Sequence, residues 1–205
     1  MGHGGAYVHQ VAPDVEARRR AVVDAPWTWL RQVHGDTVVT VAGPGAGAGT
    51  KADAAVTREP GSALAVLTAD CAPIALLSPE GVLAVVHAGW RGLLAGVVER
   101  AVQTARSLGA TELRALLGPC IHAECYQFGP GDLDAVAGRF GGSVRSVTAD
   151  GQAALDIPAA VRTALRGTGV DTVDDVDVCT ACSDDHFSWR ARGEVARQAL
   201  VVWRD

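Results

Sequence analysis

Two kinds of hydrophobic pattern alternate along the chain, and together they predict a protein that mixes strands with helices. Residues 63–67 and 82–86 are uninterrupted apolar runs, which are typical of strands covered on both faces. From Leu94 to Leu108 the apolar residues recur with helical spacing, so we expect one helix over residues 92–108 that ends at Gly109. The chain therefore contains elements that must pack in layers.

Shorter patterns complete the expected set of elements. Further strands are expected at residues 37–41, 113–117, 173–178 and 199–203. Further helices are expected at residues 14–23, 132–140 and 158–165, the last with Asp156 as its N-cap. Residues 27–32 resume an apolar pattern, and residues 43–49 form a Gly/Ala-rich loop. Because strands and helices follow one another in irregular order, the pattern predicts an α+β or mixed α/β fold with sheets flanked by helices.

Composition narrows the class of protein. A chain of 205 residues favours one domain and is long enough to bury about 70% of its unfolded surface. Its 48% hydrophobic and 20% charged residues are ordinary for a globular protein, and the net charge of −5 argues against nucleic acid as a partner. No apolar run suggests a membrane partner, and the first residues lack the pattern of a secretory signal. We therefore expect a cytoplasmic protein.

The residues that carry chemistry lie where expected strands begin or end. His34 precedes one strand, while Cys71 and His87 follow the two apolar runs. Their spacing is too wide for a zinc finger, but a folded sheet edge can bring such residues together. One Cys and two His with an open fourth position are what a catalytic zinc ion requires. The alternative is a buried cysteine with two hydrogen-bonded histidines.

Several segments resemble one family closely. The chain resembles the laccase-domain family, also called multicopper polyphenol oxidoreductases or laccase-domain purine nucleoside phosphorylases. The resemblance covers roughly residues 27–205. The segments that carry it are RQVHGDTV (31–38), ADAAVT (52–57), LTADCAPIALL (67–77), VVHAGWRG (85–92), LGPCI (117–121), CT (179–180) and FSWR (187–190).

The resemblance implies a fold, a metal and an activity. It implies that residues 1–205 form a single laccase-domain-type domain with a four-layer α/β/β/α arrangement and a shortened N-terminus. It implies that His34, Cys71 and His87 bind zinc. The implied activity is phosphate-dependent cleavage of adenosine, inosine or methylthioadenosine, alongside adenosine deamination. Two departures concern substrate binding: Gln127 replaces a familiar Glu, and the tail RARGEVAR (190–197) keeps only part of its motif.

The choice between zinc and copper can be tested on the residues. A multicopper cluster needs several His-x-His pairs, and the six histidines of this chain form none. A single blue-copper centre usually adds an axial Met, and the only methionine is Met1. The sequence therefore favours zinc over copper.

Phosphorolysis and deamination require different side chains beside the metal. Phosphorolysis needs an anion site, for which Arg91 at the start of the expected helix is one candidate, and Arg190 and Arg197 are others. Deamination needs a metal-activated water and a carboxylate that moves protons. Asp70 beside Cys71 is the nearest carboxylate, and orienting a metal ligand is its alternative role.

Two rival functions remain open at this point. A metal-free cysteine hydrolase or amidase, acting on cell-wall peptides, would use Cys71 as nucleophile and His87 as base. A non-catalytic protein would instead hold a structural zinc ion. Its ligands would be Cys120, Cys125, Cys179 and Cys182 in a closed four-thiolate site. The oligomeric state and the preferred nucleoside are not encoded in any of these patterns.

Overall fold

The structure is a computed structural model that describes residues 13–205. The helices are α1 (Pro13–Val22), α2 (Trp90–Ala95), α3 (Val97–Ser107), α4 (Pro130–Phe140), α5 (Ile157–Gly167) and α6 (Trp189–Arg192). The strands are β1 (Trp27–Trp29), β2 (Val38–Val41), β3 (Ala54–Thr57), β4 (Ala63–Thr68), β5 (Ala72–Leu77), β6 (Leu83–Ala88), β7 (Arg114–Leu117), β8 (Arg145–Val147), β9 (Ala153–Leu155), β10 (Val173–Asp175) and β11 (Gln198–Trp203).

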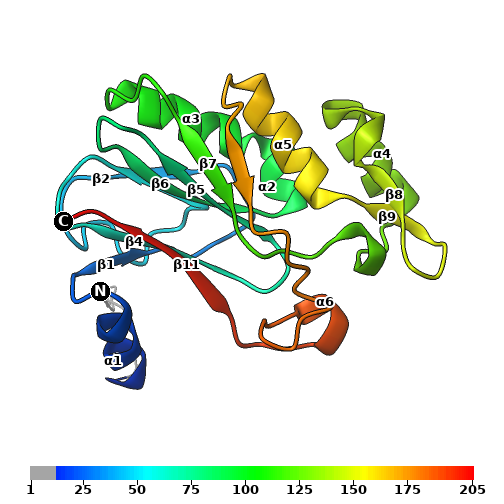
Figure 1. Cartoon of the computed structure of the whole chain (residues 1–205), viewed down its shortest axis with the longest axis horizontal. Coiled ribbons are helices and arrows are strands. Elements are labelled where there is room, and N and C mark those ends of the chain that lie inside the picture. The colour runs from blue at the N-terminus through cyan, green and yellow to red at the C-terminus, as the bar shows by residue number, and fades with distance from the viewer. Residues whose placement is uncertain (1–12) are drawn as a thin grey trace, which may run out of the picture.

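Two sheets form the centre of the molecule (Figure 1). The larger has six strands in the order β10-β7-β5-β6-β3-β2, and the smaller has three in the order β1-β4-β11. A separate hairpin, β8-β9, lies at the far side next to α4. Both large sheets mix parallel and antiparallel pairs, as β2 runs parallel to β3 whereas β3 runs antiparallel to β6. The predicted mixed α+β class is confirmed.

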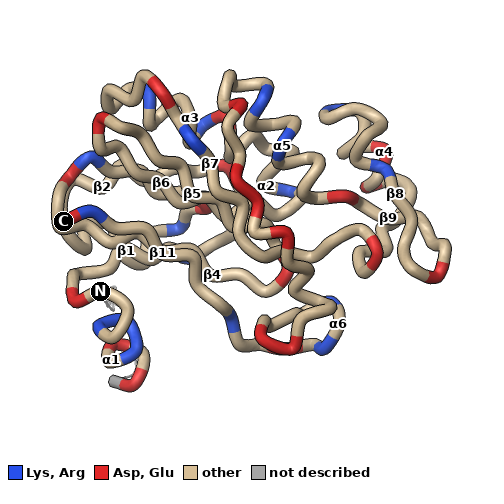
Figure 2. Tube along the Cα trace, in the orientation of Figure 1, with Lys and Arg blue, Asp and Glu red and all other residues tan. Residues whose placement is uncertain are grey.

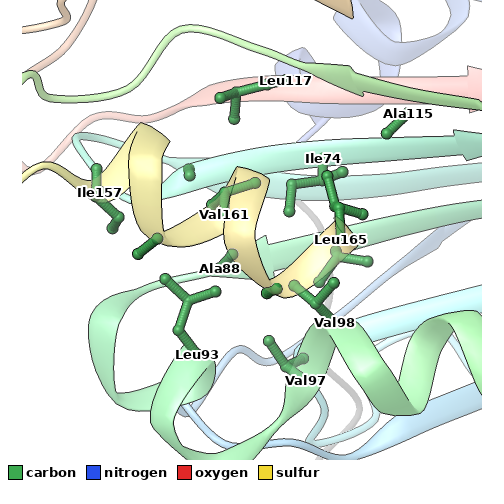
Figure 3. Close-up of a cluster of buried hydrophobic side chains, with 14 of the residues drawn as sticks. Ile74, Ala88, Leu93, Val97, Val98, Ala115, Leu117, Ile157, Val161 and Leu165 are labelled. Carbon is green, nitrogen blue, oxygen red and sulfur yellow. The ribbon is translucent and has the colours of Figure 1, made fainter. Parts of the chain in front are cut away.

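The central strands feed two separate cores because alternate residues point to opposite faces. On β6, Ala84 and Val86 belong to the core beneath the helices, whereas Leu83 and Val85 belong to the core between the sheets. Figure 3 shows the helix-side core, where Val161 and its neighbours on α5 meet side chains of α2, α3 and β5. This two-sided burial explains why β5 and β6 show no hydrophobic alternation in the sequence.

The fourth layer is provided by α1. On β1, Thr28 is fully buried, and it pairs with Leu64 of the core between the sheets. Trp27 and Trp29 therefore point to the outer face of the small sheet, and the guanidinium of Arg19 on α1 lies 5.6 and 5.5 Å from their ring centroids. The order of layers is helices, six-stranded sheet, three-stranded sheet and α1.

Most predicted elements are observed, but one helix differs. The helix expected over residues 92–108 is broken into α2 and α3 by Gly96, which has a φ of +97°. A left-handed residue cannot continue a right-handed helix, and glycine adopts this conformation without steric cost. The strands β1, β3 and β5, the β8-β9 hairpin and the short helix α6 were not predicted from hydrophobic pattern.

Charge and hydrophobicity are distributed as the composition suggests. Figure 2 shows basic and acidic segments interspersed along the trace, with an acidic stretch running from β10 into the loop that follows it. Within residues 13–205, no helix combines the length and the apolar character that crossing a membrane would demand.

Candidate metal centre and substrate pocket

Two of the predicted site residues, Cys71 and His87, come from neighbouring strands at one edge of the six-stranded sheet. Cys71 directly precedes β5, and His87 is the next-to-last residue of β6, opposite Pro73. On its other side, the His87 N–H donates to the carbonyl of Asp53, the residue before β3, at 2.7 Å. Alternate residues of a strand point to the same face, and Leu83 and Val85 face the core between the sheets. His87 therefore points to the same face, at the open end of the space between the two sheets.

His34 reaches this edge from the loop before β2. It has a φ of +59°, in the left-handed region that non-glycine residues rarely adopt. Its Nε2 lies 3.7 Å from Cys71 Sγ, and its ring centroid lies 4.8 Å from that of His87. The three candidate donor atoms all lie within 4.8 Å of one another. The structure therefore brings together the residues that the sequence predicted as ligands.

Asp53 holds this arrangement in place. Its fully buried carboxylate accepts the backbone N–H groups of Val33, His34 and Gly35 at 2.8 to 3.2 Å, so it fixes the unusual turn at His34. It also contacts His87 Nδ1 at 2.8 Å. This bond holds a proton on Nδ1, so Nε2 is the nitrogen that would bind a metal, after losing its own proton. Burial alone would raise the pKa of Asp53, but the His87 and backbone bonds lower it.

Sequence reasoning missed Asp53 as a functional residue. It stands within the ADAAVT segment that carried the family resemblance, so a signal was present. Nothing in the chain pattern, however, says that this carboxylate contacts the His87 ring and the backbone of the His34 turn.

The electrostatics of the three ligands favour a thiolate next to histidine. Burial would raise the pKa of Cys71, but hydrogen bonds and charge from His34 and His87 outweigh it and lower the pKa to about 6. Burial would lower the pKa of His87, yet its bonds with Asp53 and Cys71 raise it to about 9. Cys71 is thus held in the form that binds metal or attacks an electrophile.

Two glycines of the HAGWRG segment make the close approach possible. A Cβ on Gly89 would lie 2.8 Å from His34 Cδ2 and 3.1 Å from Cys71 Sγ. A Cβ on Gly92 would lie 3.1 Å from the carbonyl oxygen of Gly35. Any larger residue would push the His34 loop away from the sheet edge.

The donor set fits zinc. One thiolate, two imidazoles and an open side toward a cavity correspond to a three-ligand catalytic zinc site, with Asp53 supporting one imidazole. A second group of candidate ligands among residues 13–205 lies elsewhere and consists of Glu124, Cys125, Cys179 and Cys182. Cys120, which the sequence grouped with these thiols, is buried outside that group, and Glu124 takes its place.

A cavity of about 590 Å³ opens beside the three ligands. The aromatic rings of Tyr126 and Trp189 line it, and Trp189 is 56% exposed. The cavity is also lined by all seven residues that the sequence predicted for the site: His34, Asp70, Cys71, His87, Arg91, Arg190 and Arg197. Segments distant in the sequence therefore share one pocket.

Asp70 is engaged on both of its carboxylate oxygens. One oxygen accepts the hydroxyls of Thr180 and Ser188 at 2.8 and 2.6 Å, and the other accepts the backbone N–H of Arg190 at 2.7 Å. Its φ of +97° is strained for a non-glycine residue. These contacts join the loop before β5 to the start of α6, which favours an orienting role for Asp70.

The three arginines reach the pocket from separate elements. Arg91 on α2 is exposed, and its guanidinium stacks 4.2 Å from the ring centroid of Trp90. Arg190 lies 4.9 Å from the ring centroid of Tyr126 and donates to the carbonyl of Gln127. Arg197 donates to two backbone carbonyls of its own loop. Within the described chain none of the three forms an ion pair, so their positive charge is available to an anion.

Comparison with known proteins gives a consistent result. The family described as "Multi-copper polyphenol oxidoreductase laccase" matches residues 5–205. A protein of Streptomyces coelicolor named purine nucleoside phosphorylase is 40% identical over 196 residues, which are 94% of this chain and 81% of that protein. One of Streptomyces griseus with the same name is 42% identical over 195 residues, covering 92% and 78% of the two chains.

Solved structures agree on the fold. YlmD of Geobacillus stearothermophilus superposes with a TM-score of 0.82 at 28% identity and covers 98% of this chain and 84% of its own. The hypothetical protein YfiH of Bacillus licheniformis superposes with a TM-score of 0.85 at 24% identity, covering 98% and 85%. The arrangement of sheets and helices described above is therefore shared with these proteins.

Proposed function

This chain belongs to the multi-copper polyphenol oxidoreductase laccase family, and on that premise we propose that it is a zinc-dependent purine nucleoside phosphorylase. The substrates we propose are inorganic phosphate and adenosine, inosine or methylthioadenosine. Residues 1–205 would form one domain that works in the cytoplasm on small molecules rather than on nucleic acid or a membrane.

One observation carries the proposal: three metal-type ligands and three unpaired arginines line the same cavity. A nucleoside and a phosphate together need a pocket that is partly aromatic, partly cationic and a few hundred Å³ in size, and this one measures about 590 Å³. An oxidase that uses several coppers would need more histidines at the site. Within residues 13–205, the group around Cys71 contains only His34 and His87.

The donor set determines what a bound metal would contribute. When bound by His34, Cys71 and His87, zinc would supply a Lewis acid that polarises an oxygen of phosphate or water. Asp53 holds the His87 ring and the His34 turn in the orientation that this requires.

Other residues of the pocket provide the remaining needs of phosphorolysis. The guanidinium groups of Arg91 and Arg190 can bind phosphate oxygens in pairs, because their planar donors match that geometry. Tyr126 and Trp189 offer apolar faces on which a purine can stack. Thr68 also lines the cavity at the end of β4, and its buried hydroxyl has no partner within the described residues.

Deamination of adenosine is the second reaction implied for the same pocket. It requires a carboxylate that is free to move protons between water and the base. Asp70 has both oxygens bonded, three times in all. The observed contacts therefore favour phosphorolysis as the main reaction.

The test is a product analysis with metal-defined protein. Adenosine is incubated with and without phosphate, and the products are separated by chromatography. We expect adenine and ribose 1-phosphate only when phosphate is present; inosine would report deamination. Arg91→Gln should raise the phosphate concentration needed for half-maximal rate at least about tenfold, as for loss of a charged hydrogen bond. The matched control is Arg145→Gln, whose side chain pairs with Asp134 outside the pocket. Absence of adenine and ribose 1-phosphate when phosphate is present would refute the proposal, even if inosine forms.

A cysteine hydrolase is the second candidate, and one observation favours it. The lowered pKa of about 6 gives Cys71 a thiolate at neutral pH, next to His34 at 3.7 Å. Removing metal with a chelator separates the candidates. A hydrolase that uses Cys71 as nucleophile would keep its activity on peptide amides in the chelator, whereas nucleoside cleavage would stop until zinc is restored.

A further inference from the structure

A second group of soft ligands lies outside the substrate pocket. The short helical turn Ala123–Cys125 carries Glu124 and Cys125, and a loop before α6 carries Cys179 and Cys182. One donor atom from each of these four residues lies within 4.8 Å of all the others. None of the four lines the cavity beside His34, Cys71 and His87. The pocket proposed above makes no use of them.

The distances and the backbone suit a metal site. Cys125 Sγ lies 3.3 Å from Cys182 Sγ, and Cys182 Sγ lies 3.9 Å from a Glu124 oxygen. Sulfur atoms bound to one tetrahedral zinc ion lie roughly 3.8 Å apart, as bonds of about 2.3 Å require. Cys179 and Cys182 are spaced as in a C-x₂-C zinc turn, and the N–H groups of Cys182 and Ser183 both donate to the Cys179 carbonyl.

Hydrogen-bond donors surround the C-x₂-C turn. The backbone N–H of His122 donates to Cys179 Sγ at 3.4 Å. The guanidinium of Arg192 donates to the carbonyls of Thr180 and Ala181, inside the C-x₂-C turn, and so brings a positive charge to it. The sulfur atoms of Cys125 and Cys182 lie only 3.3 Å apart. Thiols held this close repel as thiolates unless a cation lies between them.

We propose that Glu124, Cys125, Cys179 and Cys182 bind a second zinc ion, distinct from the one at Cys71. Binding would release three thiol protons to solvent, and the carboxylate would complete a closed, four-ligand site. A closed site leaves no position for substrate, so its role is structural.

The position of this site indicates what it stabilises. Tyr126 follows Cys125 directly, and Arg190 lies eight residues beyond Cys182, so each ligand pair is joined to a wall of the substrate pocket. The two walls meet where Arg190 donates to the carbonyl of Gln127 at 3.0 Å. A zinc ion across the two segments would hold these walls together.

A disulfide between Cys125 and Cys182 is the competing use of the same atoms. A disulfide would use only two of the four clustered side chains and would not account for the positions of Cys179 and Glu124. It would also be unusual in a reducing compartment, where clustered cysteines more often bind metal. Its presence is one of the outcomes below.

The experiment counts zinc in four proteins purified under reducing conditions. The number of zinc ions per chain is measured by inductively coupled plasma mass spectrometry. The four proteins are the wild type, Cys71→Ala, Cys182→Ser and the double variant. We expect about two, one, one and zero equivalents, so that Cys182→Ser removes one equivalent in either background. Cys182 is exposed, and circular dichroism should show that its variant folds. The control Cys120→Ala, at a buried thiol outside the cluster, should keep both equivalents.

Cobalt substitution identifies the ligands independently of the count. Cobalt bound to Cys71→Ala should give the strong thiolate charge-transfer absorption of a site with three sulfur ligands, and the double variant should lose it. A zinc content that Cys182→Ser leaves unchanged in both backgrounds would overturn the proposal. So would a Cys125–Cys182 disulfide in peptides mapped without reduction from protein prepared with no reductant. Neither result depends on whether the chain cleaves nucleosides.

Discussion

At the scale of single residues, the site depends on one buried carboxylate that binds no metal itself. Asp53 receives three backbone N–H groups from the His34 turn and the Nδ1 proton of His87. It therefore couples the two histidines, although they come from different elements. Its cost of burial is offset by these four donors, without which the charge could not remain in the interior.

We predict that Asp53→Asn weakens zinc binding at the Cys71 site by about 10- to 100-fold, as is usual for a lost partner of a ligating histidine. The amide presents one acceptor oxygen instead of two and cannot satisfy all four donors. Competition with a chelator, in the Cys182→Ser background, measures the affinity of this site alone.

The matched control for that measurement is Asp174→Asn, which removes a carboxylate paired with Arg114 at the surface. It should leave zinc affinity unchanged. Equal affinity in the wild type and Asp53→Asn would show that the carboxylate only stabilises the loop.

At the scale of elements, strand register decides which residues meet. The pairing of β6 with β3 and β5 sets His87 between Asp53 and the segment that follows Cys71. The chain then turns away from the sheet at Gly89. This residue must be glycine because a side chain there would contact His34 and Cys71. The start of α2 is thus shaped by the site it borders.

We predict that Gly89→Ala abolishes zinc binding at the Cys71 site and nucleoside cleavage while the protein stays folded. The added Cβ would contact His34 Cδ2 at 2.8 Å, so the His34 loop must move out of ligating reach. Zinc content and product formation check this, with circular dichroism as the measure of folding.

Gly138→Ala is the control on another helix. Gly138 lies within α4, and its Cβ would contact nothing within 4 Å, so alanine should be neutral or stabilise by up to about 1 kcal/mol. Full zinc content in Gly89→Ala would contradict this prediction, because it would show that the His34 loop can move to accommodate the added Cβ while His34 still binds zinc.

At the scale of the whole molecule, the site and the cores are separate. The large hydrophobic core lies between the six-stranded sheet and the helices, whereas His34, Cys71 and His87 line the pocket at the open end of the space between the two sheets. A chain with this much buried surface has no need of the Cys71 site to fold.

We therefore predict opposite outcomes for two substitutions. Cys71→Ala should abolish nucleoside cleavage and change the free energy of unfolding of the metal-free protein by about 1 kcal/mol or less. Ile74→Ala, three residues further on, removes a fully buried side chain of the helix-side core and should cost about 2–5 kcal/mol. Urea unfolding measures both. A large loss of stability in metal-free Cys71→Ala would show that the site is part of the folding core.

The sequence by itself determined the class of fold, the positions of most helices and seven of the residues that line the pocket. Amphipathic helices such as α5 can be predicted from the 3.6-residue period of their apolar residues. The segments around His34, Cys71 and His87 were specific enough to identify the family. These signals are local, since each depends only on neighbours along the chain.

The tertiary structure alone decided the rest. Strand β3 is buried on both faces and so carries no alternating pattern, and Gly96 breaks a helix whose apolar period continues across it. That Asp53 faces His87, and that Glu124 rather than Cys120 joins three thiols, depends on which segments pair and in what register. Such contacts join residues far apart in the chain, and only the packed sheets and loops fix their distances.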